Sequence, residues 1–154
     1  MEKSEALSFC RSLNGYLSHG DIVVMGIDLK KNPQIILDAY NDKAGITAAF
    51  NLNLLMRINR ELDADFNADR FAHYQTYDPL KGACRSYLIS LEKQRVTVDG
   101  EQFNFQKDEL IDMELSQKYS LSETEELAEK SGFEIISHIM DSKSWFTDTV
   151  WKVV

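Results

Sequence analysis

Cysteine, proline and long apolar runs are scarce in this sequence, and each scarcity excludes a class of protein. Its 154 residues include two cysteines and two prolines. Cys10 and Cys84 are too few for a disulfide scaffold, and Met1–Glu5 lack the start of a secretory signal, so we expect a reducing, cytoplasmic location. The longest apolar runs are only a few residues, whereas about 20 are needed to cross a bilayer, so we expect no membrane span.

Positive charge is also in deficit. The chain has 17 Lys and Arg against 25 Asp and Glu, which gives a formal net charge of −8. Non-specific nucleic-acid binding depends on clustered Lys and Arg that replace counterions along the phosphate backbone. We therefore expect no nucleic-acid partner.

Familiar catalytic and cofactor-binding motifs are absent as well. The seven glycines are scattered, and they form no Gly-x-Gly-x-x-Gly loop, no Gly-x-x-x-x-Gly-Lys loop and no Gly-x-Ser-x-Gly elbow. His19, His73 and His138 stand alone, without Cys or His partners at zinc-ligand spacing. We expect each to be an ordinary surface or core histidine, and no metal site is predicted.

Apolar and aromatic residues, by contrast, are plentiful. They make up 44 % of the chain and include 8 Phe, 6 Tyr and 2 Trp, which is enough apolar area for a folded domain. Helices are predicted over residues 2–18, 33–40, 43–62 and 122–130. Strands are predicted over 21–28, 70–77, 84–91, 110–119, 133–140 and 145–154, with a hairpin over 96–103 around an Asp-Gly turn. This order predicts an α/β fold with a mixed sheet.

The first predicted strand has an unusually apolar sequence. Five of the six residues from Ile22 to Ile27 are apolar, which predicts a strand buried in a parallel sheet. It ends at Asp28, and in open α/β sheets the carboxyl edge of the strands is where ligands usually bind.

The longest predicted helix and the last one carry further local signals. Apolar residues recur every four positions from Ile46 to Leu62. We interpret Asn51, Asn53 and Asn59 as a solvated face of that helix, with the alternative that Asn51 and Asn53 orient the loop at Tyr40. The last helix is predicted to open with a capping box, Ser122 to Glu125, and to close at Gly132.

Four segments together resemble a known family, in the order in which that family has them. They are Gly26–Lys31, Ala39–Leu55, Asn59–Leu62 and Glu114–Tyr119, the last with the pattern Glu-x-Ser-x-Lys-aromatic. These segments resemble the histidine-specific, SAM-dependent methyltransferases, the ergothioneine-pathway enzymes that trimethylate the α-amino group of histidine. The tail from Gly132 to Phe146 also fits the end of a class I methyltransferase sheet.

The resemblance implies the C-terminal half of a Rossmann-like class I SAM methyltransferase, with a mixed sheet and an α+β substrate-binding insertion. Residues 1–28 and 120–154 are then expected to form an incomplete Rossmann-like core, and residues 29–119 the substrate-binding subdomain. The family uses S-adenosyl-L-methionine (SAM), but its glycine-rich loop precedes these segments and is absent from this chain. We therefore expect a truncated or split chain, inactive by itself, whose SAM-binding residues are unknown.

The resemblance also assigns candidate substrate-binding residues. Tyr40 matches a tyrosine that contacts the substrate carboxylate, and Thr47 and Phe50 match residues that line the pocket. A core position is equally open for Phe50. Glu114 and Ser116 match a pair that hydrogen-bonds the imidazole, and a carboxylate with a hydroxyl suits a ring that has one N–H and one basic nitrogen.

This sequence departs from the family at a few positions. Arg85 and Ser86 stand where the family has Glu-Met, so that Ser86 takes the place of a methionine near the imidazole, and Asn41 stands where the family has Asp. These changes leave the amine chemistry in place and open the choice of amino acid. Asp28 and Lys31 also match family positions, and we interpret them as structural residues at a strand end.

The predicted function is thus SAM-dependent N-methylation of the α-amino group of histidine or a related amino acid, with this chain as the substrate-recognising part. The alternative is a non-catalytic half-domain that binds an amino acid or a protein without SAM. A sheet cut through its middle exposes an edge strand, Ile22–Ile27, and apolar surface beside it. That edge is expected to pair in a homodimer or with a missing N-terminal half.

Overall fold

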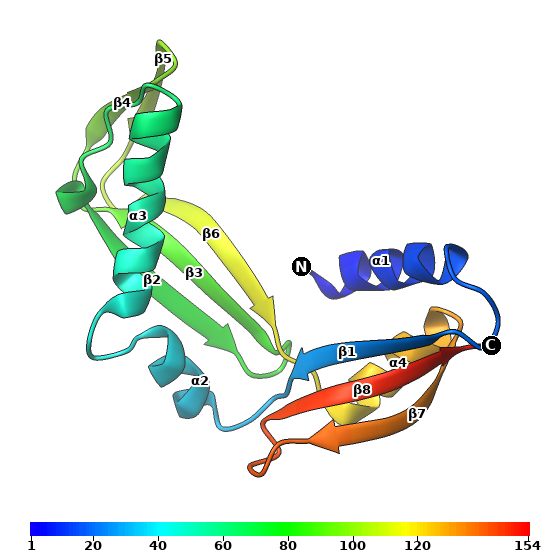
Figure 1. Ribbon diagram of the computed structural model, residues 1–154. Helices are drawn as coiled ribbons and strands as arrows, with labels where there is room; N and C mark the ends of the chain where they lie inside the picture. Colours follow the sequence, from blue (N-terminus) through cyan, green and yellow to red (C-terminus); the bar gives the residue numbers. More distant parts are fainter. The chain divides into compact units, whose positions relative to one another are not determined.

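The computed structural model describes residues 1–154, which form two compact units. Unit 1 comprises Met1–Pro33, Asp78–Ala83 and Leu115–Val154, and unit 2 comprises Gln34–Tyr77 and Cys84–Glu114. The chain therefore passes from unit 1 into unit 2 and back twice. Both units contain helices and strands (Figure 1), in keeping with the predicted α/β class.

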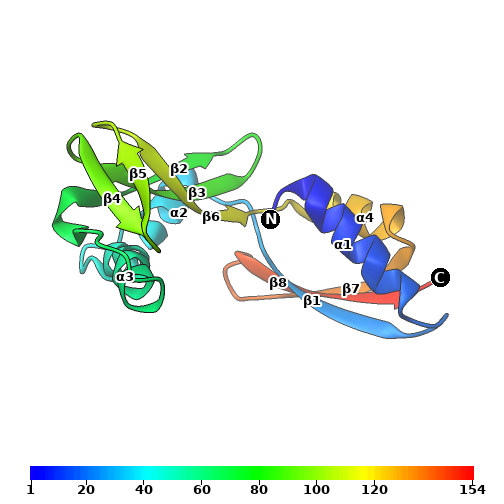
Figure 2. The same ribbon diagram turned by 90° about the horizontal axis from the view of Figure 1, so that it is seen from above.

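Unit 1 is an antiparallel sheet with two helices on one face. The strands are β1 (Ile22–Asp28), β7 (Phe133–Met140) and β8 (Phe146–Val153), in the order β1-β8-β7. Figure 2 shows α1 (Lys3–Gly15) and α4 (Leu121–Lys130) on the same side of this sheet. Trp151 and Phe133 lie in the core between the sheet and the helices, with ring centroids 5.5 Å apart. The core is completed by Cys10 from α1 and Ala128 from α4.

The expectation of a buried strand in a parallel sheet is wrong for Ile22–Asp28. β1 pairs antiparallel with β8, from Ile22 opposite Lys152 to Asp28 opposite Phe146, and it forms the edge of the sheet. Ile22 and Val24 are 52 % and 64 % exposed on the face without helices. Both faces of this strand are apolar, so its sequence cannot be distinguished from that of a fully buried strand. The expectation of an exposed edge strand beside apolar surface is confirmed.

One short parallel contact continues the edge beyond β1. Leu29 and Tyr119 form an isolated parallel bridge, in which the Tyr119 N–H donates to the Asp28 carbonyl (3.1 Å) and the Lys30 N–H donates to the Tyr119 carbonyl (2.8 Å). The end of β1 is thereby tied to the segment that follows β6 (Leu110–Gln117).

Unit 2 is built around a long helix and a sheet. Its elements are α2 (Pro33–Tyr40), α3 (Ile46–Glu61), the 3-10 turn η1 (Ala68–Arg70), β2 (Phe71–Asp78), β3 (Ala83–Ser90), β4 (Gln94–Val98), β5 (Glu101–Phe105) and most of β6. The sheet order is β2-β3-β6, and β4 and β5 form a separate hairpin. The core contains Leu55, Phe71 and Leu88, with Phe66 and Phe105 packed against it.

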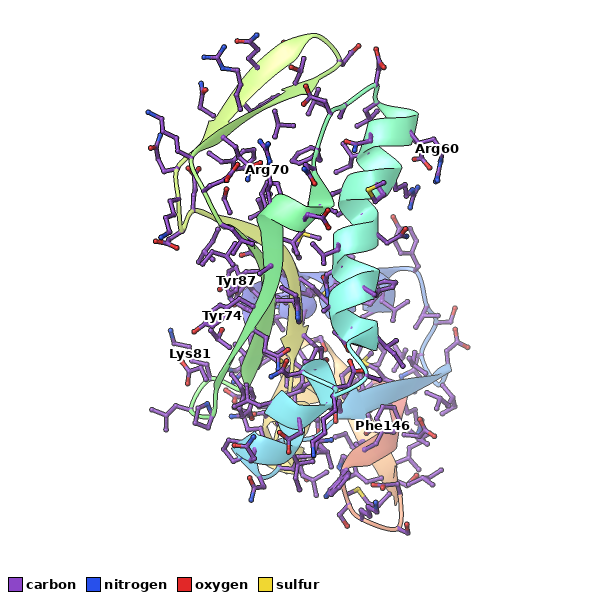
Figure 3. The ribbon with its side chains drawn as sticks, turned by 90° about the vertical axis from the view of Figure 1, so that its left-hand side faces the viewer. Arg60, Arg70, Tyr74, Lys81, Tyr87 and Phe146 are labelled. Atoms are coloured by element: carbon purple, nitrogen blue, oxygen red, sulfur yellow. The ribbon has the colours of Figure 1, made fainter.

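The turns of unit 2 follow from local chemistry. Asp99 and Gly100 both have positive φ, at 49° and 79°, as the predicted Asp-Gly hairpin turn requires. Pro33 occupies the first turn of α2, where its missing N–H costs no helical hydrogen bond. Figure 3 shows Tyr74 and Tyr87 on the side of β2 and β3 that faces away from α3.

The apolar series on α3 does not face the core. Ile46, Phe50 and Leu54 are exposed, whereas Asn51 and Leu55 are buried. The interpretation of Asn51 as part of a solvated face is therefore wrong, and Asn59 is also half-buried, with its side chain bonded to the N–H and carbonyl of Phe66. Asn53 is exposed as expected. Polar side chains can face inward on α3 because their amide groups bond to nearby backbone.

The predicted start of the last helix is shifted by two residues. The capping box is formed by Ser120 and Glu123, and α4 begins at Leu121. The Ser120 hydroxyl accepts from the Glu123 N–H (3.2 Å), and the Glu123 carboxylate accepts from the Ser120 N–H (2.7 Å). Gly132 follows the helix with φ +83°, which confirms it as the stop.

Candidate functional site

Five of the six predicted binding residues lie in unit 2, and Ser116 lies in unit 1. Each unit has its own pocket with at least one of these residues in its lining.

The junction of α2 and α3 holds Tyr40 and Thr47. Tyr40 is the last residue of α2 and is half-buried. The Asp42 carboxylate accepts from the backbone N–H groups of Ile46 and Thr47, each at 2.8 Å, and these bonds keep the pKa of Asp42 below its ordinary value. The Thr47 carbonyl in turn accepts from the Asn51 side chain (3.0 Å). Hydrogen bonds between side chains and the backbone therefore hold the first turn of α3, where the resemblance places the substrate pocket.

Phe50 and Glu114 meet at a pocket of about 250 Å³ within unit 2. Leu54 and Met113 line its apolar part, and Arg57 lines its polar part. Phe50 is 73 % exposed, so the core position left open for it is excluded. The structure therefore brings together one residue of α3 and one of β6 that the resemblance assigned to the same ligand.

Ser86 lies apart from that pocket. It is buried on β3, where Cys84, Ser86, Leu88 and Ser90 alternate with partly exposed residues. Strand alternation puts all four on one face. Tyr40, Thr47 and Ser86 do not line the pocket of Phe50 and Glu114, so their contact with a common ligand stays a prediction.

Ser116 belongs to a charged cluster at the carboxyl end of β1. The Lys118 ammonium donates to Ser116 Oγ (2.8 Å) and pairs with Asp28 Oδ2 (2.6 Å). Asp28 Oδ1 accepts from Lys31 Nζ (2.5 Å), and Lys31 Nζ also donates to the Trp145 carbonyl (3.1 Å). Burial alone would raise the pKa of Asp28, but the hydrogen bonds and charges of Lys118 and Lys31 outweigh it and lower this pKa.

Ser116 and Asp28 also line a pocket of about 330 Å³ in unit 1. Its apolar wall includes Phe9 and Cys10 of α1 and Met25 of β1. Burial raises the pKa of the Cys10 thiol, so this cysteine is an inert part of the wall. The pocket therefore combines this apolar wall with polar residues, among them Asp28, Ser116 and Gln117.

Sequence reasoning missed the role of Lys118 in this cluster. Its side chain is only 2 % exposed, which is rare for a lysine and requires a paired charge. One signal was present, because Glu114, Ser116 and Lys118 are spaced two residues apart at the end of a strand. The fold adds what the sequence cannot show, namely that Asp28 is the partner.

The sequence predicts His73 only as an ordinary surface or core histidine and predicts no role for Gln75. His73 Nε2 and Gln75 Oε1 are buried without a hydrogen-bond partner, two residues apart on the same strand. Gln75 Nε2 donates to the Leu37 carbonyl at the end of α2 (2.5 Å). Burial lowers the pKa of His73, although the Asp42 charge opposes this, so its imidazole is neutral near pH 7.

The carboxyl end of β1 does not fit a SAM site. No glycine-rich loop follows β1; instead its carboxyl end leads into Leu29, Lys30 and Lys31. Asp28, the acidic residue at that end, is already paired with two lysines. A cationic sulfonium would meet positive charge there rather than free acceptors. No group of three or more His, Cys, Asp or Glu could hold a metal ion, and no helix is long and apolar enough to span a membrane.

Comparisons with known proteins relate the chain to one family. A family model described as "Histidine-specific methyltransferase, SAM-dependent" matches residues 1–153. Histidine N-alpha-methyltransferases of Mycobacterium tuberculosis and Mycolicibacterium smegmatis are each 39 % identical to it over 90 residues, which is 58 % of this chain and 28 % of theirs. Ergothioneine biosynthesis protein 1 of Schizosaccharomyces pombe is 28 % identical over 137 residues, 88 % of this chain and 18 % of that protein.

A structural comparison gives a weaker likeness. A SAM-dependent methyltransferase from Clostridium acetobutylicum aligns with 99 % of this chain and 52 % of its own, with a TM-score of 0.48 and 8 % sequence identity. The sequence relatives named above are matched over less than a third of their own lengths.

Proposed function

Because the chain belongs to the histidine-specific, SAM-dependent methyltransferase family, we propose that it is the substrate-recognising part of an enzyme that methylates the α-amino group of histidine or a related amino acid. One observation carries this proposal: Phe50 and Glu114, assigned to one ligand by the resemblance, line one pocket. The resemblance assigns Ser116 to the same ring, and strand alternation puts it on the same face of β6 as Glu114, two residues further on.

The proposed site recognises the amino acid by its three polar parts. Tyr40 donates its hydroxyl to the substrate carboxylate, as a neutral donor does without adding charge. Glu114 accepts the ring N–H and Ser116 donates to the basic ring nitrogen. The resemblance assigns Thr47, Phe50 and Ser86 to the surroundings of the ring, and of these Phe50 lines the pocket with Glu114. In this proposal the ring is held while its amine is positioned away from water. SAM supplies the methyl group in this family, and the carboxyl end of β1, where Asp28 is paired with two lysines, does not fit it.

We assign the two units different roles in this proposal. Unit 1 is part of the methyltransferase core, and unit 2 is the substrate-binding subdomain. Support comes from the pocket of unit 2, which contains candidate residues from α3 and β6, and from the three-stranded sheet of unit 1. Cys10 and Cys84 are buried and form no disulfide, which supports a cytoplasmic location for the protein.

The edge of β1 is proposed as the place where the core is completed. Ile22 and Val24 are exposed beside an unpaired strand edge, and such an edge binds a further strand readily. The occupant is an N-terminal half of the same fold, in keeping with the greater length of the relatives, or a second copy of this chain. Light scattering at high concentration separates these, because a second copy doubles the mass and a missing half leaves a monomer.

Calorimetry with two ligands tests the function. We expect histidine to bind this chain, because Phe50 and Glu114 line one pocket, and S-adenosylhomocysteine not to bind, because Asp28 at the end of β1 is already paired with two lysines. The protein from its full reading frame should then transfer methyl groups from SAM to histidine or a related amine. Absence of any methyl transfer there would contradict the proposal.

A second candidate function is a half-domain that binds an amino acid or a protein without SAM. The observation that favours it is that Asp28, the acidic residue at the carboxyl end of β1, is already paired with Lys31 and Lys118. It predicts that the full protein binds histidine and still transfers no methyl group. Stoichiometric binding of S-adenosylhomocysteine would exclude it.

A further inference from the structure

Lys118 is held in one place by three independent contacts. Its backbone N–H donates to the Gly82 carbonyl (2.7 Å), and its ammonium reaches both Asp28 Oδ2 and Ser116 Oγ, at 2.6 and 2.8 Å. Gly82 has φ +74°, and a Cβ there would lie 2.3 Å from the Lys118 carbonyl oxygen. The turn at Gly82 is therefore shaped to lie against this lysine.

Its charge is also secured. A lysine that is 2 % exposed requires a paired carboxylate to offset the cost of burying its charge. Asp28 provides one, and Lys31 holds the other oxygen of that carboxylate, so the carboxylate cannot turn away from Lys118. The ammonium is thus a fixed donor, with no acceptor capacity of its own.

This fixed donor restricts what Ser116 can do. A hydroxyl has one proton and two lone pairs, and Lys118 occupies one lone pair. The Ser116 proton cannot point at the ammonium, so it is left to be donated to another group. The nearby positive charge also polarises the hydroxyl and strengthens it as a donor.

We propose that Lys118 is a positioning residue that fixes Ser116 as a hydrogen-bond donor and thereby selects a substrate ring with a basic, unprotonated nitrogen. This inference rests on the proposed function, because it takes Ser116 to face the ring. It adds a reason for the direction of one hydrogen bond: Ser116 donates to the ring because Lys118 occupies its acceptor side. Lys118 itself does not touch the substrate.

The first test needs no ligand. The ammonium ¹⁵N and ¹H signals of Lys118 and Lys31 are recorded by NMR in the wild type and in Ser116→Ala. We expect the Lys118 signal to shift and the Lys31 signal to stay, because only Lys118 contacts Ser116. An unchanged Lys118 signal would overturn the inference whether or not the protein binds histidine.

The second test is a double-mutant cycle on histidine affinity, measured by calorimetry on this chain. Lys118→Met should weaken binding about tenfold, the scale of one lost hydrogen bond. In the Ser116→Ala background it should have no further effect, because Lys118 acts only through that hydroxyl. Lys130→Met is the matched control: it removes an exposed ammonium of unit 1 that pairs with Glu126 and not with Asp28 or Ser116, and it should change affinity less than about twofold.

The outcomes separate the inference from the function on which it rests. An equal loss from Lys118→Met in both backgrounds would show a merely structural lysine and overturn the inference. If the wild type binds no histidine while the Lys118 signal responds to Ser116→Ala, the proposed function fails and the ring-facing role fails with it. If Lys118→Met does not fold, Ser116→Thr provides the test instead. The inference is supported if Ser116→Thr has the histidine affinity that Ser116→Ala loses and also has the Lys118 signal of the wild type. If Ser116→Thr binds histidine as weakly as Ser116→Ala, the inference is overturned.

Discussion

The two units hold their candidate binding residues in different ways. In unit 1, Ser116 is bonded to a buried lysine whose charge is paired with Asp28. In unit 2, Phe50 and Glu114 are exposed, and α3 is anchored by its opposite side through Leu55. The contacts that position Ser116 also contribute to the stability of unit 1. Phe50 and Glu114, by contrast, lie on the surface of unit 2 and contribute little to its core. Substitutions should therefore separate stability from recognition in unit 2 and combine them in unit 1.

The largest effect is expected in the core of unit 1. Trp151 is fully buried against Phe133, and its indole N–H donates to Thr149 Oγ1 (2.9 Å). Trp151→Ala should lower the free energy of unfolding by about 3–5 kcal/mol, because it leaves a large cavity. Denaturant titration followed by circular dichroism measures this. A loss below about 1 kcal/mol would show that the sheet and helices do not depend on this contact.

The next effect concerns the turn beneath Lys118. Gly82→Ala combines a positive φ with a Cβ placed 2.3 Å from the Lys118 carbonyl oxygen, and should cost about 2–3 kcal/mol of unfolding free energy. Gly100→Ala is the matched control, since it has φ +79° and open space around it, and it should cost only about 1 kcal/mol. Equal losses would mean that the contact with Lys118 adds nothing.

The stability of unit 1 should depend on pH through Glu123. Burial would raise the pKa of Glu123, but its bonds to Lys3 and Lys30 outweigh this and lower the pKa from 4.5 to about 2. A carboxyl whose pKa is depressed by folding stabilises the fold above its unfolded pKa. This contribution, about 1–2 kcal/mol after solvent screening, should be lost as the pH falls from about 4.5 to 2. Glu123→Gln should flatten that part of the stability profile; an unchanged profile would contradict the assignment.

The smallest change in stability is expected at Phe50. Phe50→Ala should alter the free energy of unfolding by less than about 0.5 kcal/mol, because the side chain is 73 % exposed. Histidine affinity should nevertheless fall about tenfold, as expected when an aromatic contact is removed. Ile46→Ala, one turn earlier on the same exposed side and outside the pocket, should leave both quantities unchanged. Equal affinities for the two variants would remove Phe50 from the site.

Local chemistry explains which features the sequence could predict. The Asp99-Gly100 turn, Pro33 at the start of α2 and Gly132 after α4 follow from backbone preferences of single residues, and all three predictions are confirmed. The capping box was placed two residues late because Ser122 and Glu125 have the same spacing as Ser120 and Glu123. A spacing rule alone cannot choose between overlapping candidates.

Tertiary contacts explain the predictions that failed. On α3 the apolar residues do recur every four positions, but the side chains buried against the core are those of Asn51 and Leu55. The apolar run of β1 has helices on one face only. The burial of Lys118 could not be predicted, because its partner Asp28 is 90 positions away in sequence (118 − 28) and no local pattern distinguishes a buried lysine from an exposed one. The pairing of Phe50 with Glu114 was implied by resemblance and not by any pattern in the residues.

The edge position of β1 also makes this strand a reporter of assembly by hydrogen exchange. Val153 donates to Asp21 (3.0 Å) and Leu29 donates to Trp145 (2.9 Å) in one continuous register with β8. Odd-numbered residues therefore bond to β8, and the amides of Val24 and Gly26 point away from it. Amide protection should alternate along β1, slow at Val23 and Met25 and fast at Val24 and Gly26. The alternation should disappear once another strand joins this edge, so the exchange pattern of a few amides reports on the completeness of the whole sheet.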